Sequence, residues 1–217
     1  MKFFVDSAET EEIKRLVDTG LVDGITTNPS LVAKSGRPYV ALLEEITRLV
    51  SGPVSAEVLS EDCHSMLQEG RSLAAIAENV VVKLPLTTDG IKACSTLIKE
   101  GIRINITLCF SAVQALLAAK AGATFVSPFV GRLDDLSQGG MQLIRDIVSI
   151  YKNYDNISTQ VLVASVRSPL HVAEAAKMGA DIVTLPPKIL WQLFNHPLTD
   201  KGLTAFIADY KARDMVD

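Results

Sequence analysis

The chain has 217 residues, of which 48% are hydrophobic and 21% charged, and it carries a formal net charge of -4 with a pI near 5.4. This length predicts one domain with a full hydrophobic core. The acidic balance argues against nucleic acid or an anionic membrane surface as the main partner. No run of the sequence reaches the roughly 18 apolar residues of a membrane span. We therefore expect neither nucleic acid nor a membrane among the partners.

The amino terminus leads directly into a strand-like run at 2–6, without the apolar core of a secretory signal. Cys63, Cys94 and Cys109 are odd in number and widely spaced. This pattern is typical of reduced thiols rather than of a disulfide framework or a metal-binding knuckle. We therefore expect a cytoplasmic protein in which the cysteines serve packing.

Short runs rich in Val and Ile alternate with longer helical patterns along the chain. The runs predicted as strands are 3–6, 24–27, 54–58, 80–84, 102–108, 124–129, 160–164 and 182–185. The helical patterns include 9–19, 39–50, 62–78, 111–121 and 134–153, the last with Gly139-Gly140 as a candidate break. Such alternation is typical of parallel strands joined by right-handed helical crossovers.

Eight such units, in little more than the lower limit of about 200 residues, favour a closed (β/α)8 TIM barrel. A doubly wound open sheet is the alternative, but the number of strands favours closure. No linker or low-complexity tract interrupts the pattern, so we predict a single domain over 1–217. Its end reads as a helix over 188–195 and an additional C-terminal helical tail over 199–217, which is free to cover the barrel or contact a neighbouring subunit.

Lys83 lies in an unbroken apolar, Val-rich run with no acidic residue between positions 79 and 88. Burial without a partner favours the neutral amine over the ammonium ion. A neutral amine is a nucleophile toward carbonyls and can form a Schiff base. The alternative is a lysine that extends from a strand end into water. Because strand ends of parallel barrels point into active sites, we favour a catalytic Lys83.

Two carboxylates and a hydroxyl stand at other predicted strand ends. Asp6 is either a helix cap or a working acid/base, and beside a catalytic lysine we favour the second interpretation. Glu57 should face the barrel interior, where Lys83 on the next strand is its nearest partner. A structural ion pair is the alternative there. Thr107, one strand further on, could hold a water between itself and Glu57.

A polar turn and two arginines follow further strands. Asn28 lies in the turn Thr-Thr-Asn-Pro-Ser at 26–30, and the following proline holds it in an extended conformation. It is either a turn former or a ligand for sugar hydroxyls. Arg132 follows the sixth predicted strand and Arg167 the seventh. Because loops after strand seven often bind phosphate on this fold, the two arginines predict an anionic substrate.

Histidines are absent from the predicted strand ends, since His64, His171 and His196 lie in helical patterns or in the tail. A metal-dependent lyase would need imidazole ligands around an open site, so this alternative is weak. No glycine-rich dinucleotide or P-loop motif occurs. The sequence therefore indicates neither a metal site nor a nucleotide cofactor.

Together these motifs resemble the transaldolase family, most closely its short form, which includes the fructose-6-phosphate aldolases. The resemblance covers nearly the whole chain and rests on Asp6, the turn at 26–30, Val-Lys-Leu-Pro at 82–85, Ile-Thr at 106–107 and Val-Ser-Pro-Phe-Val-Gly-Arg at 126–132. It implies a Schiff base between Lys83 and a ketose phosphate in the pentose phosphate pathway. A dihydroxyacetone unit would pass from sedoheptulose 7-phosphate to glyceraldehyde 3-phosphate, giving erythrose 4-phosphate and fructose 6-phosphate.

The resemblance also implies a role for each motif. Asp6 would take and return the proton of the C4 hydroxyl, while Glu57 and Thr107 would position the water that shuttles protons. The residues implied in substrate binding are Asn28, Thr27, Ser127 and Phe129 around the retained three-carbon unit, and Arg132, Ser165 and Arg167 around the phosphate.

Two positions separate the subfamilies within this resemblance. The aldolases carry glutamine where Glu57 stands and tyrosine where Phe129 stands. A tyrosine hydroxyl would help protonate the enamine and release free dihydroxyacetone, which Phe129 cannot do. Transfer is therefore favoured over a fructose-6-phosphate aldolase, and a non-catalytic phosphosugar-binding barrel is less favoured still. The resemblance further implies a homo-oligomer, a ring-based decamer with the terminal helix on a neighbour.

Overall fold

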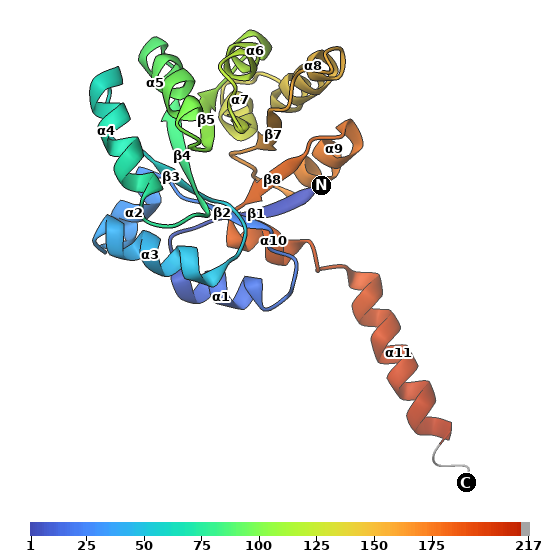
Figure 1. Ribbon diagram of the computed structural model, residues 1–217. Helices are drawn as coiled ribbons and strands as arrows, with labels where there is room; N and C mark the ends of the chain where they lie inside the picture. Colours follow the sequence, from blue (N-terminus) through green and yellow to red (C-terminus); the bar gives the residue numbers. More distant parts are fainter. Residues whose placement is uncertain (214–217) are drawn as a thin grey trace.

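The computed structural model describes residues 1–213 and shows eight parallel strands that close into a barrel in chain order (Figure 1). The strands are β1 (Lys2–Asp6), β2 (Gly24–Thr26), β3 (Val54–Glu57), β4 (Val80–Pro85), β5 (Ile104–Cys109), β6 (Phe125–Pro128), β7 (Gln160–Val163) and β8 (Ile182–Leu185). The predicted (β/α)8 fold is confirmed, and each predicted strand matches an observed one to within two residues at either end.

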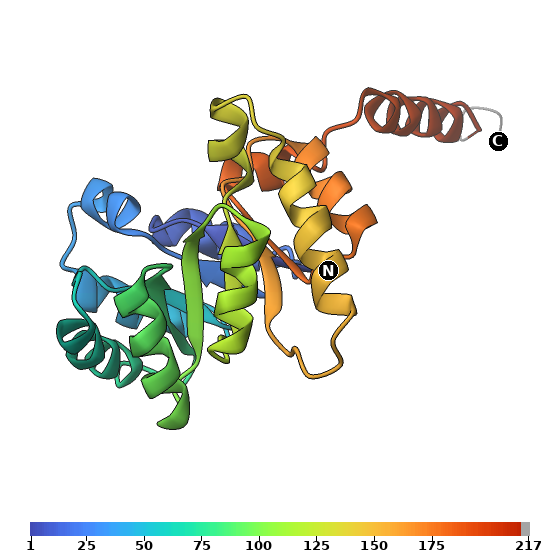
Figure 2. The same ribbon diagram turned by 90° about the horizontal axis from the view of Figure 1, so that it is seen from above.

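Helices follow the strands and surround the barrel (Figure 2). They are α1 (Thr10–Val17), α2 (Pro29–Ser35), α3 (Tyr39–Leu49), α4 (Cys63–Ala74), α5 (Thr88–Lys99), α6 (Ala112–Lys120), α7 (Val130–Asp135), α8 (Gly140–Lys152), α9 (Pro169–Met178) and α10 (Pro187–Gln192). The predicted helix over 134–153 is divided before Gly140, as the glycine pair indicated. The sequence pattern missed α2 and α7, because helices of 7 and 6 residues are too short to show an apolar period.

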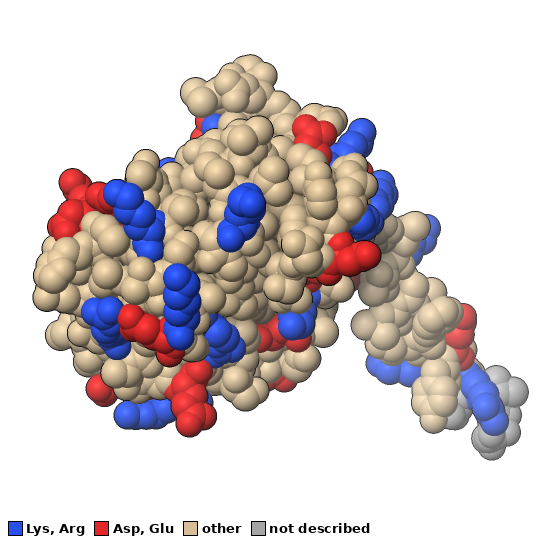
Figure 3. All heavy atoms as spheres, turned by 45° about the horizontal axis from the view of Figure 1, so that its top comes forward, with Lys and Arg blue, Asp and Glu red and all other residues tan. Residues whose placement is uncertain are grey.

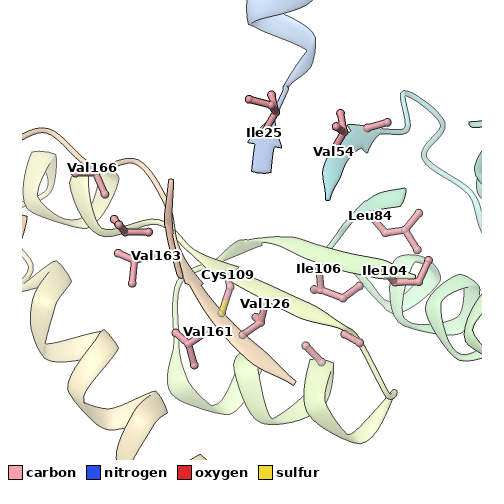
Figure 4. Close-up of a cluster of buried hydrophobic side chains, with 14 of the residues drawn as sticks. Ile25, Val54, Leu84, Ile104, Ile106, Cys109, Val126, Val161, Val163 and Val166 are labelled. Atoms are coloured by element: carbon pink, nitrogen blue, oxygen red, sulfur yellow. The ribbon is translucent and has the colours of Figure 1, made fainter. Parts of the chain in front are cut away.

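The larger core lies between the strands and the helices around them. Successive strand residues point to opposite faces, so every second residue faces outward. Figure 4 shows part of this layer, in which Ile104, Ile106, Val126 and Val163 are fully buried. The opposite strand face fills the barrel, where apolar side chains such as Phe4 are joined by buried polar ones such as Ser55 and Asn105.

A second, smaller core fills the inside of the barrel near the amino ends of the strands. Its members are the fully or almost fully buried side chains Phe4, Val81, Phe125, Leu162 and Ile182. Phe4 and Phe125 pack edge to face with ring centroids 6.0 Å apart. A Cβ atom at Gly24 would come within 2.7 Å of the Phe4 ring, so the start of β2 must be glycine for the ring to fit.

The C-terminal helix α11 (Pro197–Arg213) extends away from the barrel in both ribbon views, and its residues 197–213 include no buried one (Figures 1 and 2). This confirms the additional C-terminal helix. The last positions of the predicted tail, 214–217, lie outside the described residues.

Within residues 1–213, no helix is both long and apolar enough to cross a membrane. Lys and Arg are interspersed with Asp and Glu on the face in Figure 3. The three cysteines carry free thiols, and burial raises the pKa of Cys94 and of Cys109 to about 12. Two of the three thiols are therefore poorly reactive and contribute to packing, as expected.

Candidate active site

A polar layer lies directly above the apolar core inside the barrel, towards the carboxyl ends of the strands. Two residues beyond Phe4 and Val81, the same inward faces carry Asp6 and Lys83. They line a cavity of about 130 Å³. The full lining is Asp6, Thr26, Asn28, Lys83, Ser127, Phe129, Arg132, Ala164, Ser165 and Thr184. The residues predicted at several strand ends thus meet in one place.

Lys83 is only 4% exposed and has two partners, one on the neighbouring strand β3 and one directly after β2. Its Nζ lies 2.8 Å from Oε2 of Glu57, which is beside it in the strand register, and donates to the carbonyl of Thr27 at 3.2 Å. The expectation of a lysine without a partner is therefore wrong. That expectation considered neighbours along the chain, whereas the acid comes from the adjacent strand, as the ion-pair alternative proposed.

Asp6 shares the cavity with Lys83 and is held by a hydroxyl. Thr26 Oγ1 donates to Asp6 Oδ1 at 2.8 Å and lies 2.7 Å from the hydroxyl of Thr184. Burial raises the pKa of Asp6 above its ordinary value of 3.8, while the charge of Lys83 and the hydrogen bond from Thr26 act in the opposite direction. Asp6 can consequently hold a proton more readily than an exposed aspartate.

Asn105 is a site residue that sequence reasoning missed. It lies beside Lys83 in the register of β4 and β5, and it is completely buried. Its amide donates to Ser55 Oγ at 3.1 Å and accepts from Ser127 Oγ at 2.8 Å. Asn105 thus fixes the predicted ligand Ser127. The signal was present, because Asn105 precedes Thr107 by two residues and so shares its inward face.

Glu57 and Thr107 differ in how their polar atoms are satisfied. The phenol of Tyr39 donates to the main-chain carbonyl of Glu57 at 3.0 Å, which fixes the end of β3. Thr107 Oγ1 is buried and has no hydrogen-bond partner among residues 1–213. A buried hydroxyl without a partner is energetically unfavourable.

Both interpretations of Asn28 are compatible with the structure. Its Oδ1 accepts from the amide of Leu31 at 3.0 Å and caps α2, and the same residue lines the cavity. Thr27 is not among the described residues that line the cavity. Its hydroxyl donates to the carbonyl of Ser55 at 2.8 Å. A second cavity of about 460 Å³ also borders Asn28 and Lys83, so the mouth extends beyond the first cavity.

The two arginines that were predicted to bind the substrate phosphate are placed differently. Arg132 lines the cavity and stacks over the Phe129 ring at 5.0 Å. Arg167 is outside the described lining, and its guanidinium is bound to Asp135. Ser165 lines the cavity with a positive φ of 59°, which is uncommon for a residue other than glycine. The structure therefore brings Arg132 and Ser165 to Lys83 but leaves Arg167 aside.

Among residues 1–213, no three His, Cys, Asp or Glu side chains are grouped so that they could hold a metal ion. The cavity is lined by an amine, one carboxylate and several hydroxyls. The carboxylate of Glu57 lies next to the amine and borders the second cavity. A buried amine next to a carboxylate can form and hydrolyse a Schiff base.

Comparisons with known proteins match nearly the whole chain to one family. A family model described as transaldolase/fructose-6-phosphate aldolase matches residues 3–215. A probable transaldolase of Rhodospirillum centenum is 62% identical over 97% of this chain and 91% of its own length. Probable transaldolases of Parvibaculum lavamentivorans and Ruegeria pomeroyi are 60% and 58% identical, and the matches cover 97% and 99% of this chain and the same shares of those proteins.

Among solved structures, the chain is similar to a thiamine phosphate pyrophosphorylase from Pyrococcus furiosus. The TM-score is 0.57 at 16% sequence identity, and the match covers 85% of each chain. At this identity the similarity concerns the barrel fold alone.

Proposed function

The chain belongs to the transaldolase/fructose-6-phosphate aldolase family, and from this we propose that it is a transaldolase of the pentose phosphate pathway. It would transfer a dihydroxyacetone unit from sedoheptulose 7-phosphate to glyceraldehyde 3-phosphate, giving erythrose 4-phosphate and fructose 6-phosphate. The observation that carries this proposal is the buried Lys83, held 2.8 Å from Glu57 in a polar cavity.

In the first step, Lys83 must lose a proton before it can attack a carbonyl, and Glu57 is close enough to accept it. The amine then adds to the C2 ketone of the donor sugar and forms a carbinolamine. Return of the proton from Glu57 to the carbinolamine hydroxyl lets water leave and gives the protonated imine. Thr107, whose buried hydroxyl has no hydrogen-bond partner among residues 1–213, would hold this water beside Glu57.

In the second step, Asp6 removes the proton of the C4 hydroxyl. The C4–O⁻ electrons form the aldehyde carbonyl, the C3–C4 bond breaks, and its electron pair moves into the protonated imine to give an enamine on Lys83. The raised pKa of Asp6 suits a group that must take up this proton and later return it. The enamine adds to the acceptor aldehyde in the reverse sequence, and hydrolysis frees Lys83.

The remaining residues of the proposed site would bind the sugar-phosphate substrate. Asn28, Ser127 and Thr27 would hold the three-carbon unit, and Asn105 keeps Ser127 in position. The phosphate would be bound by the loops after β6 and β7, that is by Arg132, Ser165 and Arg167. We propose that neither a metal nor an organic cofactor takes part, since Lys83 itself provides the electron-accepting imine.

Transfer is favoured over aldol cleavage by Phe129, which lines the cavity and has no hydroxyl to protonate the enamine. The test is the consumption of fructose 6-phosphate with and without erythrose 4-phosphate. We expect turnover only when the acceptor is present. Equal rates in both reactions would instead indicate a fructose-6-phosphate aldolase. In the same assay, Phe129→Tyr should increase the release of free dihydroxyacetone.

We also propose that the chain is one domain that forms a cytoplasmic homo-oligomer, a decamer by its resemblance to the family, with α11 packed on a neighbouring subunit. Leu203, Phe206, Ile207 and Tyr210 are exposed at helical spacings of three and four residues, so they form an apolar stripe. Such a stripe is typical of an interface. Light scattering on the wild type and on Phe206→Asp tests this, and an unchanged mass in the variant would contradict the role of α11.

A further inference from the structure

An ion pair and a second side-chain contact connect α7 to the segment that follows β7. Arg167 Nη1 and Nη2 donate to Asp135 Oδ1 and Oδ2 at 2.8 and 2.7 Å. His171 Nε2 lies 3.2 Å from Asp134 Oδ2. The same segments are joined through the backbone, because the amides of Val130 and Gly131 donate to carbonyls of residues 164 and 165 at 3.1 and 3.0 Å. The segments therefore remain connected without the Asp135 contact.

The Arg167–Asp135 pair is exposed, with side chains 52% and 53% accessible. Exposed ion pairs contribute little to stability. The geometry of the pair matters more, because the planar guanidinium binds a carboxylate and a phosphate with the same two parallel hydrogen bonds. Asp135 thus occupies both terminal nitrogens that a phosphate would use.

The position of Arg167 relative to the cavity supports a functional role for this contact. Arg132 and Ser165 line the cavity, whereas Arg167, from the same part of the barrel mouth, is outside the lining formed by the described residues. The guanidinium of Arg167 is therefore engaged by Asp135 instead of being presented to the cavity.

Resting on the proposed function, we infer that Asp135 is a specificity-determining residue that occupies Arg167 as an internal substitute for the substrate phosphate. A substrate phosphate must displace this carboxylate before it can bind the guanidinium of Arg167. A phosphate monoester carries a charge near -2 at pH 7 and can compete, particularly next to Arg132. The uncharged terminal hydroxyl of an unphosphorylated sugar cannot displace the carboxylate of Asp135 from Arg167. Asp135 therefore lowers the affinity for phosphorylated sugars selectively and leaves that for unphosphorylated ones unchanged.

Asp135→Asn tests this inference, because it removes the charge and keeps the size of the side chain. The KM for fructose 6-phosphate should fall about two- to fivefold, the range that an exposed ion pair supports. The KM for fructose, with glyceraldehyde as acceptor, should stay the same. The dissociation constant of inorganic phosphate, measured by calorimetry, should fall by the same factor as the KM for fructose 6-phosphate.

The chain offers a matched control in the pair between Arg71 and Glu100. It also consists of two hydrogen bonds, which here run from Nε and Nη2 of Arg71 to the carboxylate at 2.8 and 2.7 Å, and it is also partly exposed. It lies at the carboxyl ends of α4 and α5, which face the opposite end of the barrel from the cavity. Glu100→Gln changes the net charge equally and should leave all three constants unchanged, and Asp135→Glu should stay close to the wild type.

An unchanged or higher KM for fructose 6-phosphate in Asp135→Asn, together with unchanged or weaker phosphate binding, would overturn the inference. Asp135 would then orient Arg167 for the substrate or be irrelevant to it. Circular dichroism verifies the fold of the variant, and Asp135→Ser replaces it if it does not fold. If the wild type fails to turn over sugar phosphates, the proposed function fails, but the titration with inorganic phosphate still decides the role of Asp135.

Discussion

The inside of the barrel contains two layers built on the same strands but with opposite properties. The lower layer consists of apolar side chains, with Phe4 and Val81 among them. The upper layer, two residues further along the same strands, carries Asp6 and Lys83. The backbone geometry is the same in both layers. On β1 and β4, one inward position therefore serves stability and the next one serves the candidate site.

The two layers also differ in what burial does to them. In the lower layer burial is favourable by itself, because apolar area leaves water. In the upper layer each buried polar group needs a partner. The ion pair of Lys83 with Glu57 and the chain of bonds from Ser55 through Asn105 to Ser127 supply such partners. Substitutions should therefore affect activity in the upper layer and stability in the lower one.

The largest expected effect is that of Asp6→Asn in the upper layer. The variant keeps the hydrogen-bond acceptor for Thr26 but can no longer move a proton, so kcat should fall about 10²–10⁴-fold. Steady-state kinetics with fructose 6-phosphate and erythrose 4-phosphate measures this. A loss of less than about threefold would contradict the role of Asp6, since a proton carrier contributes about 10² or more.

Asp6→Asn should also change how the stability of the fold depends on pH. Because burial raises the pKa of Asp6 in the fold above 3.8, the unfolded chain loses this proton first as the pH rises. Ionised Asp6 therefore destabilises the fold, and this effect is absent below pH 3.8 and grows until the pH exceeds the folded pKa. Thermal unfolding should show Asp6→Asn to be more stable than the wild type at neutral pH, with the difference vanishing in acid.

Phe4→Ala in the lower layer should have the opposite consequences. It removes a fully buried ring that packs on Phe125, so the free energy of unfolding should fall by about 3–5 kcal/mol. Urea unfolding measures the loss, and kcat per folded molecule should remain within about threefold of the wild type. A stable variant with a strongly reduced kcat would show that the two layers do not divide their tasks in this manner.

The smallest effects on activity and stability are expected for Thr107→Val. Thr107 is an exception in the upper layer, because its buried hydroxyl has no partner among residues 1–213. The variant is similar in size and removes the hydroxyl that has no partner among the described residues, so the fold should become more stable by about 1 kcal/mol. Turnover should slow by about tenfold, because the water beside Glu57 loses a ligand. Unfolding and kinetic measurements on one sample separate the two effects, and a faster enzyme would refute the role of Thr107.

Much of the division between the apolar and the polar layer could be predicted from the sequence, because it depends on the alternation of inward and outward side chains along single strands. The eight strands, the catalytic candidate Lys83 and the acid Asp6 all follow from apolar runs and from the residues that end them. Contacts between strands were less accessible. The inward face of the third predicted strand indicated Glu57 as a partner of Lys83, although the two are 26 positions apart along the chain. Only the sheet shows that they are adjacent and paired.

The remaining features depend on side-chain conformation, which no pattern along the chain specifies. The pattern identified Arg167 but could not reveal that its guanidinium binds Asp135. Similarly, Asn105 stood inside a predicted strand, where its bonds to Ser55 and Ser127 became visible only in the closed barrel. Short helices such as α2 and α7 were missed because their placement depends on the loops around them.

The most direct test of the central claim is reduction by borohydride in the presence of fructose 6-phosphate. The account predicts a covalent adduct that peptide mass spectrometry locates on Lys83, together with loss of activity, and no adduct in Lys83→Met. An enzyme that keeps its activity under borohydride, or an adduct on another lysine, would contradict it.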